Sequence, residues 1–561
     1  MGEHFDLLIR GGVVYDGSGD PGRPGDVGVR GGRIAALGGP GELGTDAARR
    51  LEVDGLAVCP GFVDIHTHYD AQVLWDRSVS ISPWHGVTTA VMGNCGFGIA
   101  PTRPEHRDLI LRTLENVEGM SLDALHAGLG SDWPFESFPD YLDAVEERGS
   151  AINLAALLGH TPLRTFVLGE EATERAATDR EIATMAALAR ESFAAGAAGF
   201  ATSKSPTHVG AAGRPVPSRA AHFDEVARIV DELSHGVIQA TIGRGLFIDE
   251  LTELQQRTGR TVSWTALLTT GRGPDFHRGM LARHAELQAR GVEVVPQVSC
   301  RPLNFEFQFE APFIYESMAC FEPVSAADRE GKKRIFADPE FRQAFREGLS
   351  TGVLAGGWDR TVVAQYDPEP ELAEREVAAL ARERGVDPVD LVLDLALASD
   401  LEARFRAGVM NTDEEGVAEL LTHPCVVLGL SDAGAHASQL CDACFSTHLL
   451  GYWVRERGTL ELPQAIRMLT SRAAEVFGIE GRGRLAEGAA ADVVVFDPER
   501  VGCTPLRRVH DLPGGADRLI SEARGIEAVI VNGQMLRESG KDVLDSQGPL
   551  PGRLLRSGRR A

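Results

Sequence analysis

The sequence is poor in cysteine and in positive charge, and it has no long apolar run. Eight cysteines in 561 residues are too few for a disulfide framework. No stretch approaches the roughly 20 apolar residues that a membrane-spanning helix needs. The formal net charge of −25 argues against a nucleic-acid partner, because phosphate binding requires clustered Lys and Arg. We therefore expect a soluble protein with neither a nucleic-acid nor a membrane partner.

The sequence also shows neither a secretion signal nor a cysteine pattern typical of a zinc site. Residues 1 to 15 lack the basic stretch and apolar run of a secretion signal, so a cytoplasmic location is expected. The basic end, Arg553 to Arg560, is interpreted as a solvated tail. Cys441 and Cys444 have redox-motif spacing, but no second such pair completes a zinc site, and they are interpreted as ordinary thiols. Homo-oligomer formation is compatible with these features.

What is present is the composition of a globular α/β protein, with 43% hydrophobic residues and 63 glycines. The first 60 residues form short alternating segments broken by glycines, which is typical of antiparallel strands. The same pattern returns near the end, where Asn532 and Gly533 give a strong hairpin signal. Residues 1–60 and 481–561 are therefore predicted to form one composite β-sandwich domain.

Residues 61–480 alternate short apolar strands with amphipathic helices, which predicts a (β/α)8 TIM-type barrel. One helix is expected from Asp179 to Ala194, with Thr178 as its cap. Residues 301 to about 370 fit no such unit and are interpreted as an insertion that forms a lid. The eight barrel strands are expected at Phe62 to His66, Thr88 to Met92, Asn153 to Leu158, Gly199 to Thr202, Val237 to Ala240, Val262 to Leu267, Val292 to Val298 and Val426 to Leu430.

The first of these strands delivers two histidines as it ends, in Gly61-Phe62-Val63-Asp64-Ile65-His66-Thr67-His68. Side chains two residues apart on a strand point the same way, so both imidazoles can bind one metal ion. The last strand ends in Ser431 and Asp432, and closure of a barrel would bring it beside the first strand. The Asp432 carboxylate could then bind the metal and take a proton from metal-bound water.

Cys95 lies in a glycine-rich segment, Gly93 to Gly98, directly after the second strand. Glycines let a backbone come close to a ligand or a metal, and a thiolate is a fitting zinc ligand. A buried cysteine without a chemical role is the other interpretation, and the sequence leaves both open.

Together these segments resemble the amidohydrolase superfamily, and most closely its N-acyl-D-amino-acid deacylase branch, over essentially the whole chain. The resemblance implies a zinc-bearing barrel with a β-sandwich made from both termini. It also implies His66, His68 and Asp432 as metal ligands, Cys95 as a possible ligand, and Asp432 as the general acid and base. The segments that carry it are Pro60 to Asp70, Trp84 to Thr89, Gly93 to Gly98, Leu430 to His436 and Ala491 to Asp497.

The sequence departs from this pattern on the fifth and sixth strands, where members of the superfamily usually place a histidine each. Either fewer protein ligands hold one metal, or another group replaces them; one or two zinc ions are compatible with this. Lys204 lies near where related hydrolases carry a carboxylated, metal-bridging lysine, but a substrate-binding or surface lysine is the favoured interpretation. Further substrate-binding candidates at strand ends are His160, His208, Arg272, Arg301 and His436.

The predicted reaction is hydrolysis of a linear, non-peptide amide in a small-molecule substrate, with N-acyl-D-amino acids as the expected class. The metal would lower the pKa of bound water toward about 7, and Asp432 would move the proton to the departing nitrogen. One alternative is a cyclic amidase that opens a hydantoin-like ring, which carboxylation of Lys204 and two metals would favour. Another is a binding protein on a degenerate barrel that has lost two metal ligands.

Overall fold

The computed structural model describes residues 4–210, 213–270, 273, 275–316, 318–349 and 357–558. Its centre is a parallel eight-stranded sheet that runs in chain order and carries every predicted barrel strand. The first and last strands meet through a parallel bridge between Thr67 and Ala433, where the His68 N–H donates to the Ala433 carbonyl. The predicted barrel is therefore confirmed. Its strands are β6 (Phe62–Asp64), β7 (Val87–Met92), β8 (Asn153–Gly159), β9 (Gly199–Ser203), β10 (Val237–Thr241), β11 (Val262–Thr265), β12 (Val294–Val298) and β16 (Val427–Leu428).

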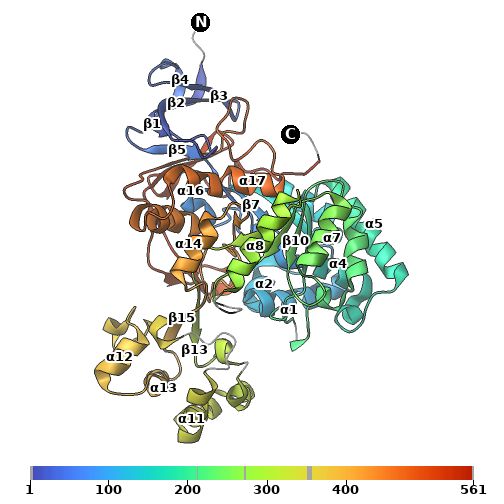
Figure 1. The fold of residues 1–561 in the computed structure, drawn as a ribbon, viewed down its shortest axis with the longest axis vertical. Coiled ribbons are helices and arrows are strands. Elements are labelled where there is room, and N and C mark those ends of the chain that lie inside the picture. The colour runs from blue at the N-terminus through green and yellow to red at the C-terminus, as the bar shows by residue number, and fades with distance from the viewer. Residues whose placement is uncertain are drawn as a thin grey trace.

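Helices cover the outside of this sheet (Figure 1). The predicted helix is α5 (Asp179–Ala195), in which the Thr178 side chain and Glu181 form a reciprocal cap. Its buried face includes Ile182, Met185 and Phe193. No helix in the described part of the chain is both long and apolar enough to cross a membrane. Other helices around the barrel are α1 (Arg107–Glu118), α3 (Phe138–Arg148), α4 (His160–Leu168), α6 (Phe223–Val230), α7 (Ile248–Thr258), α8 (Phe276–Ala289), α14 (Glu414–Thr422) and α17 (Ser471–Phe477).

A nine-stranded sheet joins the two ends of the chain. The junction is the antiparallel pair of β5 (Ala57–Pro60) and β17 (Val493–Phe496), so neither end completes this sheet alone. Val58, Val493 and Val495 belong to its buried apolar cluster. The remaining strands are β1 (Phe5–Val14), β2 (Arg23–Arg30), β3 (Arg33–Gly38), β4 (Ala47–Glu52), β22 (Ile526–Val531), β23 (Gln534–Glu538) and β24 (Lys541–Asp542).

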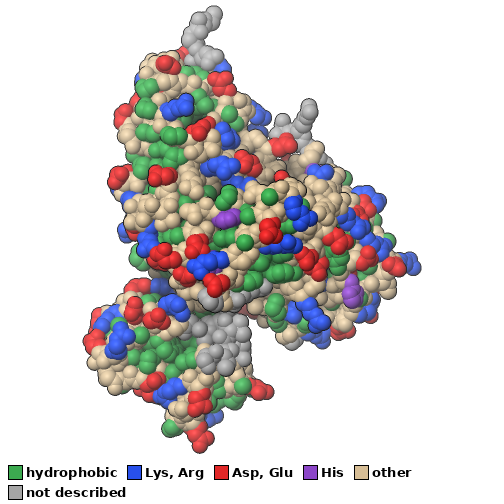
Figure 2. Space-filling model, in the orientation of Figure 1, with side chains coloured by type: hydrophobic (Ala, Val, Ile, Leu, Met, Phe, Trp, Pro, Cys, Tyr) green, Lys and Arg blue, Asp and Glu red, His purple; other side chains and the backbone are tan. Residues whose placement is uncertain are grey.

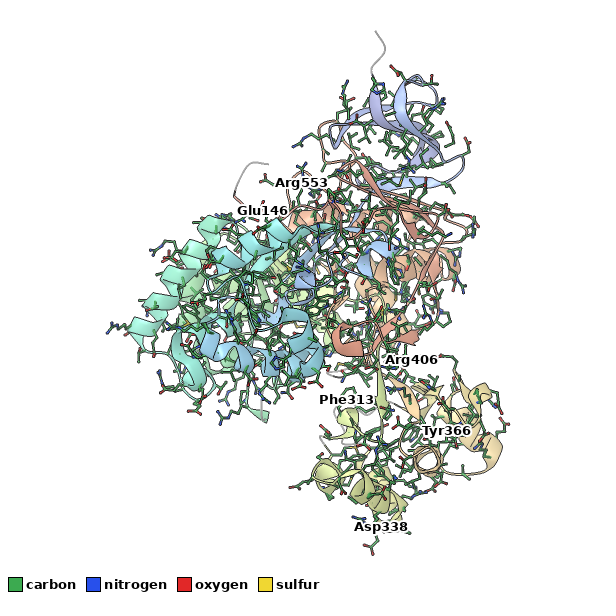
Figure 3. The ribbon with its side chains drawn as sticks, turned by 180° about the vertical axis from the view of Figure 1, so that it is seen from behind. Glu146, Phe313, Asp338, Tyr366, Arg406 and Arg553 are labelled. Atoms are coloured by element: carbon green, nitrogen blue, oxygen red, sulfur yellow. The ribbon has the colours of Figure 1, made fainter. Side chains whose placement is uncertain are left out.

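The insertion after β12 has its own hydrophobic core and projects from the barrel (Figures 1 and 3). Its sheet pairs β13 (Leu303–Gln308) and β14 (Thr361–Gln365) with β15 (Arg404–Met410), which lies between them. Because β15 is part of this core, the segment extends to Met410 and not to about residue 370. Its helices include α10 (Arg329–Ala337), α11 (Pro339–Gly348), α12 (Val377–Arg384) and α13 (Pro388–Ala398).

The described part of the basic end, residues 553–558, is docked on the barrel, so its interpretation as a solvated tail is wrong there; Arg559 and Arg560 lie outside the described residues. The Leu154 N–H donates to the Arg553 carbonyl, and the Leu555 N–H donates to the Leu154 carbonyl. The Arg556 guanidinium pairs with carboxylates of α3, including that of Glu146, which Figure 3 shows near Arg553. The basic side chain thus finds partners from a distant segment. On the face shown in Figure 2, acidic and basic side chains are interspersed over the barrel and the insertion.

Candidate metal centre

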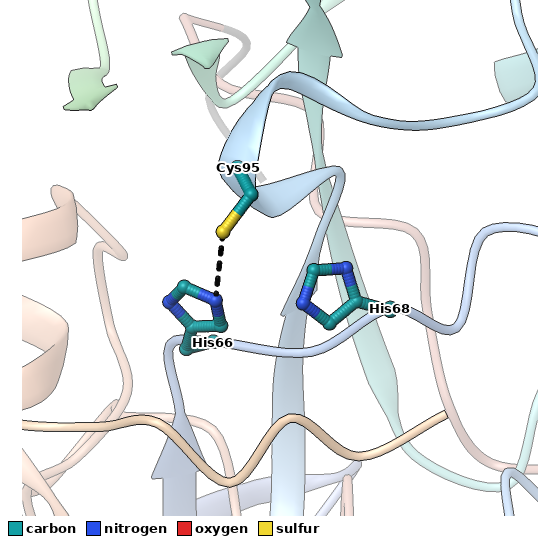
Figure 4. A group of neighbouring side chains, drawn as sticks. All are labelled: His66, His68 and Cys95. Carbon is teal, nitrogen blue, oxygen red and sulfur yellow. Dashed lines mark hydrogen bonds between the residues drawn. The ribbon is translucent and has the colours of Figure 1, made fainter. Parts of the chain in front are cut away.

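His66 and His68 lie just beyond the end of β6, at the carboxyl edge of the barrel sheet. Their ring centroids are 5.3 Å apart, and their exposed fractions are 1% and 7%. Figure 4 shows both rings next to Cys95. The alternation of side chains along an extended segment, which predicted this pairing, is the reason why the residue between them points elsewhere.

Cys95 follows β7 in a tight turn. Gly93 opens that turn with a φ of 87°, a conformation that glycine adopts without steric cost. The Cys95 Sγ atom lies 3.4 Å from Nε2 of His66 (Figure 4). Burial acts to raise the pKa of the thiol, but the charge and hydrogen bond of His66 lower that pKa to about 7. A thiol that ionises near neutral pH is well suited to bind a metal ion.

Asp432 comes from the opposite end of the barrel sequence, just after β16. Its Oδ1 atom lies 3.3 Å from Nε2 of His66 and 3.7 Å from Nε2 of His68. Its side chain is 23% exposed, so Asp432 is accessible to solvent, whereas the histidines next to it are buried. Burial acts to raise the pKa of Asp432, but a hydrogen bond with His68 and the charges of both histidines hold it well below its usual range. Asp432 is therefore a carboxylate at neutral pH.

These donors fit a divalent metal ion with nitrogen, sulfur and oxygen ligands. Tetrahedral zinc, with its usual bond lengths, separates a nitrogen from an oxygen by about 3.3 Å and a nitrogen from a sulfur by about 3.6 Å. The observed separations are 3.3, 3.7 and 3.4 Å. Within the described residues, His66, His68 and Cys95 are the one group of three or more such side chains whose ligand atoms all lie within 4.8 Å of one another.

Two further residues, which the sequence did not predict, contact the outer ring nitrogens of the histidines. Nδ1 of His66 lies 2.7 Å from Oε1 of Gln297 on β12. Nδ1 of His68 lies 3.2 Å from Oε1 of Glu118, the last residue of α1. Gln297 could have been noticed as a polar residue within an apolar strand, whereas no local pattern marks Glu118. Burial acts to raise the pKa of Glu118, but the charge of His68 lowers it.

His208 and His436 lie near Glu118, and therefore near this group. Nδ1 of His208 lies 2.7 Å from the Ser203 hydroxyl, and its ring packs on Phe97 at a centroid distance of 5.1 Å. Burial lowers the pKa of His208 to about 4, so it is neutral near pH 7. The ring of His436 packs against the ring of Phe305 in the insertion, with a centroid distance of 5.8 Å. The insertion thus reaches the loop that carries Asp432.

Two other candidates, His160 and Lys204, belong to a separate buried cluster. Both ring nitrogens of His160 have protein partners, the Thr202 hydroxyl at 2.8 Å and the Glu225 carboxylate at 2.9 Å. The Lys204 ammonium donates to the carbonyls of Ser218, Arg219 and Ala221. The structure therefore does not bring either side chain into the donor group around His66.

Of the two arginine candidates, Arg301 lies within the described residues and Arg272 does not. The Arg301 guanidinium donates to the Asp442 carboxylate at 2.7 Å, and both side chains are largely buried. A substrate carboxylate would have to compete with this partner.

The sequence matches the amidohydrolase family model over residues 52–537. The chain belongs to this family. This amidohydrolase is 32% identical to the D-aminoacylase of Alcaligenes xylosoxydans xylosoxydans, with 94% of each chain covered. The family expectation from the sequence is confirmed.

Two solved structures share the fold of this amidohydrolase over nearly its whole length. One is a D-aminoacylase, described for the functional role of its binuclear metal center; it has 27% identity and a TM-score of 0.64, with 98% of this chain and 100% of that chain covered. The other is an N-acyl-D-glutamate deacylase from Bordetella bronchiseptica, complexed with zinc and a phosphonate inhibitor. It has 26% identity and a TM-score of 0.65, with 99% and 100% covered.

Proposed function

We propose that this amidohydrolase is a zinc-dependent deacylase that hydrolyses the linear amide of N-acyl-D-amino acids. The observation that carries the proposal is the convergence of His66, His68, Cys95 and Asp432 at the carboxyl edge of the barrel. The similarity to a D-aminoacylase and to an N-acyl-D-glutamate deacylase supports this substrate class. The products would be a carboxylic acid and a free D-amino acid.

In this proposal, the four residues bind the ion, and Asp432 also transfers a proton. When bound, the ion would supply Lewis acidity, which polarises the amide carbonyl and acidifies water. Asp432 is ionised and partly exposed, so it can accept a proton from the attacking water at neutral pH. The same carboxyl group can then donate that proton to the departing nitrogen. The buried imidazoles and the thiolate would hold the ion beside it.

A cyclic amidase is the second candidate, and the position of Lys204 argues against it. That function would be favoured by a carboxylated Lys204 bridging two metals. Instead, the ammonium group of this lysine is occupied by three backbone carbonyls. We therefore favour hydrolysis of a linear amide.

A panel of N-acyl-D-amino acids, N-acyl-L-amino acids and cyclic amides tests the proposal on protein stripped of metal and then reloaded with zinc. We expect stripped protein to be inactive and zinc to restore hydrolysis of the D-substrates. His66→Ala should lose metal affinity, whereas His510→Ala, which removes an exposed imidazole, should not. Zinc-loaded protein that cleaves no N-acyl amino acid would refute the deacylase assignment. Metal content below about a tenth of an equivalent, with no activation on addition, would refute metal dependence.

A further inference from the structure

The wall of the barrel behind the donor group is made of neutral polar side chains. Gln239 lies on β10, Ser263 and Thr265 on β11, and Gln297 on β12, and all four are buried. The Gln297 amide donates to the Ser263 hydroxyl at 3.1 Å, and the Gln239 amide donates to the Thr265 hydroxyl at 3.4 Å. Each glutamine nitrogen thus has a partner on the neighbouring strand. This arrangement turns both amide oxygens toward the metal-binding residues.

The Gln239 oxygen accepts a hydrogen bond from the Cys95 N–H at 2.7 Å. A backbone N–H can only donate, so this contact fixes the orientation of the Gln239 amide. Cys95 itself has a φ of 57°, in the left-handed region that non-glycine residues seldom adopt. The hydrogen bond therefore helps to hold the turn that presents the thiol to His66.

The Gln297 oxygen orients the His66 ring through a hydrogen bond in the same way. An amide oxygen can only accept, so the 2.7 Å contact places a proton on Nδ1 of His66. In the neutral imidazole the lone pair is then on Nε2, the atom that faces Cys95 and Asp432. This is the tautomer that binds a metal through Nε2. Because glutamine is neutral, the contact selects the tautomer without adding a second negative charge beside the ion.

We infer that Gln239 and Gln297 are positioning residues that build a centre for a single metal ion. A second ion would need ligands of its own on this wall. Among the described residues there, amides and hydroxyls that already bond to one another occupy the positions facing Cys95 and His66. This chain would therefore differ from the D-aminoacylase described as having a binuclear metal center. The inference rests on the proposed metal dependence, but not on the identity of the substrate.

Metal titration without substrate tests this inference. Stripped wild-type protein, titrated with zinc and separately with Co²⁺, should bind about one equivalent tightly, and the Co²⁺ form should show thiolate-to-metal absorption. Two tight equivalents, or none, would overturn the single-ion centre. Because no substrate is present, binding of one equivalent by a protein that cleaves no N-acyl amino acid would leave the inference standing and the deacylase assignment refuted.

The positioning role of Gln297 is tested with three variants. Gln297→Leu removes the acceptor at similar volume and should weaken zinc binding about 10- to 100-fold. Gln297→Glu keeps an acceptor and should restore most of that loss, which a purely structural role would not predict. Gln256→Leu, at an exposed position of α7, is the matched control and should bind zinc as wild type does. Wild-type affinity in Gln297→Leu would overturn the proposed role, whatever its thermal stability.

Discussion

Single residues at the candidate metal centre have different surroundings, and we expect different tasks from them. Asp432 is the most exposed of the four donors, and the neighbouring imidazoles keep its pKa low. Cys95 is almost completely buried and is held by its own backbone hydrogen bond. Under the proposed function, Asp432 would exchange protons with the substrate, and Cys95 would only hold the ion. Substitutions at the two positions should therefore have different effects.

Asp432→Asn separates proton transfer from metal binding. The amide keeps an oxygen near the ion but cannot take up a proton at neutral pH. We expect kcat to fall by at least about 100-fold while zinc content largely survives. Steady-state kinetics combined with elemental analysis checks this. If the variant keeps more than about a tenth of wild-type kcat, the proton acceptor is another group near the site.

Cys95→Ser decides whether the thiol is a ligand or a buried residue without a chemical role. Serine is a poorer zinc ligand of nearly the same size, so we expect weaker zinc binding and loss of the thiolate-to-Co²⁺ absorption. Competition with a chelator measures the affinity. Cys59→Ser, at a fully buried cysteine outside the donor group, controls for general disturbance of the core. Equal zinc affinity in both variants would show that Cys95 is not a ligand.

Elements around the centre are locked together by a buried charge cluster. Glu225 on α6 accepts hydrogen bonds from Arg164 of α4 and pairs with His160 at the start of the same helix. His160 also contacts Thr202 on β9. Burial acts to raise the pKa of Glu225, but its hydrogen bond with His160 and the charges of His160 and Arg164 lower it to about 2. The cluster therefore joins two helices to the barrel strand that precedes Lys204.

Glu225→Gln should reveal this cluster through the pH dependence of stability. The folded-state pKa lies below the ordinary value, so the contribution is fully present above about pH 4.5 and is lost as the pH falls toward 2. At pH 7 we expect the variant to be about 3 kcal/mol less stable than wild type. The difference should shrink as wild-type Glu225 becomes protonated. Urea unfolding at several pH values measures it, and a difference independent of pH would contradict this account.

At the scale of the whole molecule, contacts between the two ends of the chain complete the nine-stranded sheet. β5 and β17 are adjacent in that sheet, and β1 lies on the far side of β5. The buried cluster in the sheet takes residues from both ends, among them Leu7, Ile9, Val493 and Ile530. Removing one end would expose apolar residues of the other.

Deletion of residues 1–55 tests this mutual dependence. The truncation removes β1 to β4 and leaves β5, β17 and β22 without much of their buried contact surface. We expect lower solubility, a lower melting temperature and rapid proteolysis within residues 490–540. Differential scanning calorimetry and limited proteolysis measure these changes. A soluble truncated protein with wild-type thermal stability would show that the C-terminal strands fold on their own.

The sequence by itself determined the features that depend on neighbours in the chain. Strand alternation placed His66 and His68 on one side, the Thr178 cap located α5, and the order of strands and helices predicted the barrel. Closure of that barrel brought Asp432 to the histidines, as the order of strands implied. The roles of these residues as ligands and base stay predictions.

Only the tertiary structure decided which distant side chains contact the candidate metal centre and which lie apart from it. Gln297 and Glu118 reach the histidines from β12 and α1, and Lys204 turns away to backbone carbonyls. The extent of the insertion depended on pairing between Leu303–Gln308 and Arg404–Met410. The docking of the C-terminal segment depended on its hydrogen bonds with β8. Such contacts join residues far apart in the chain, so their free energy depends on the folded arrangement and leaves no local periodicity or spacing in the sequence.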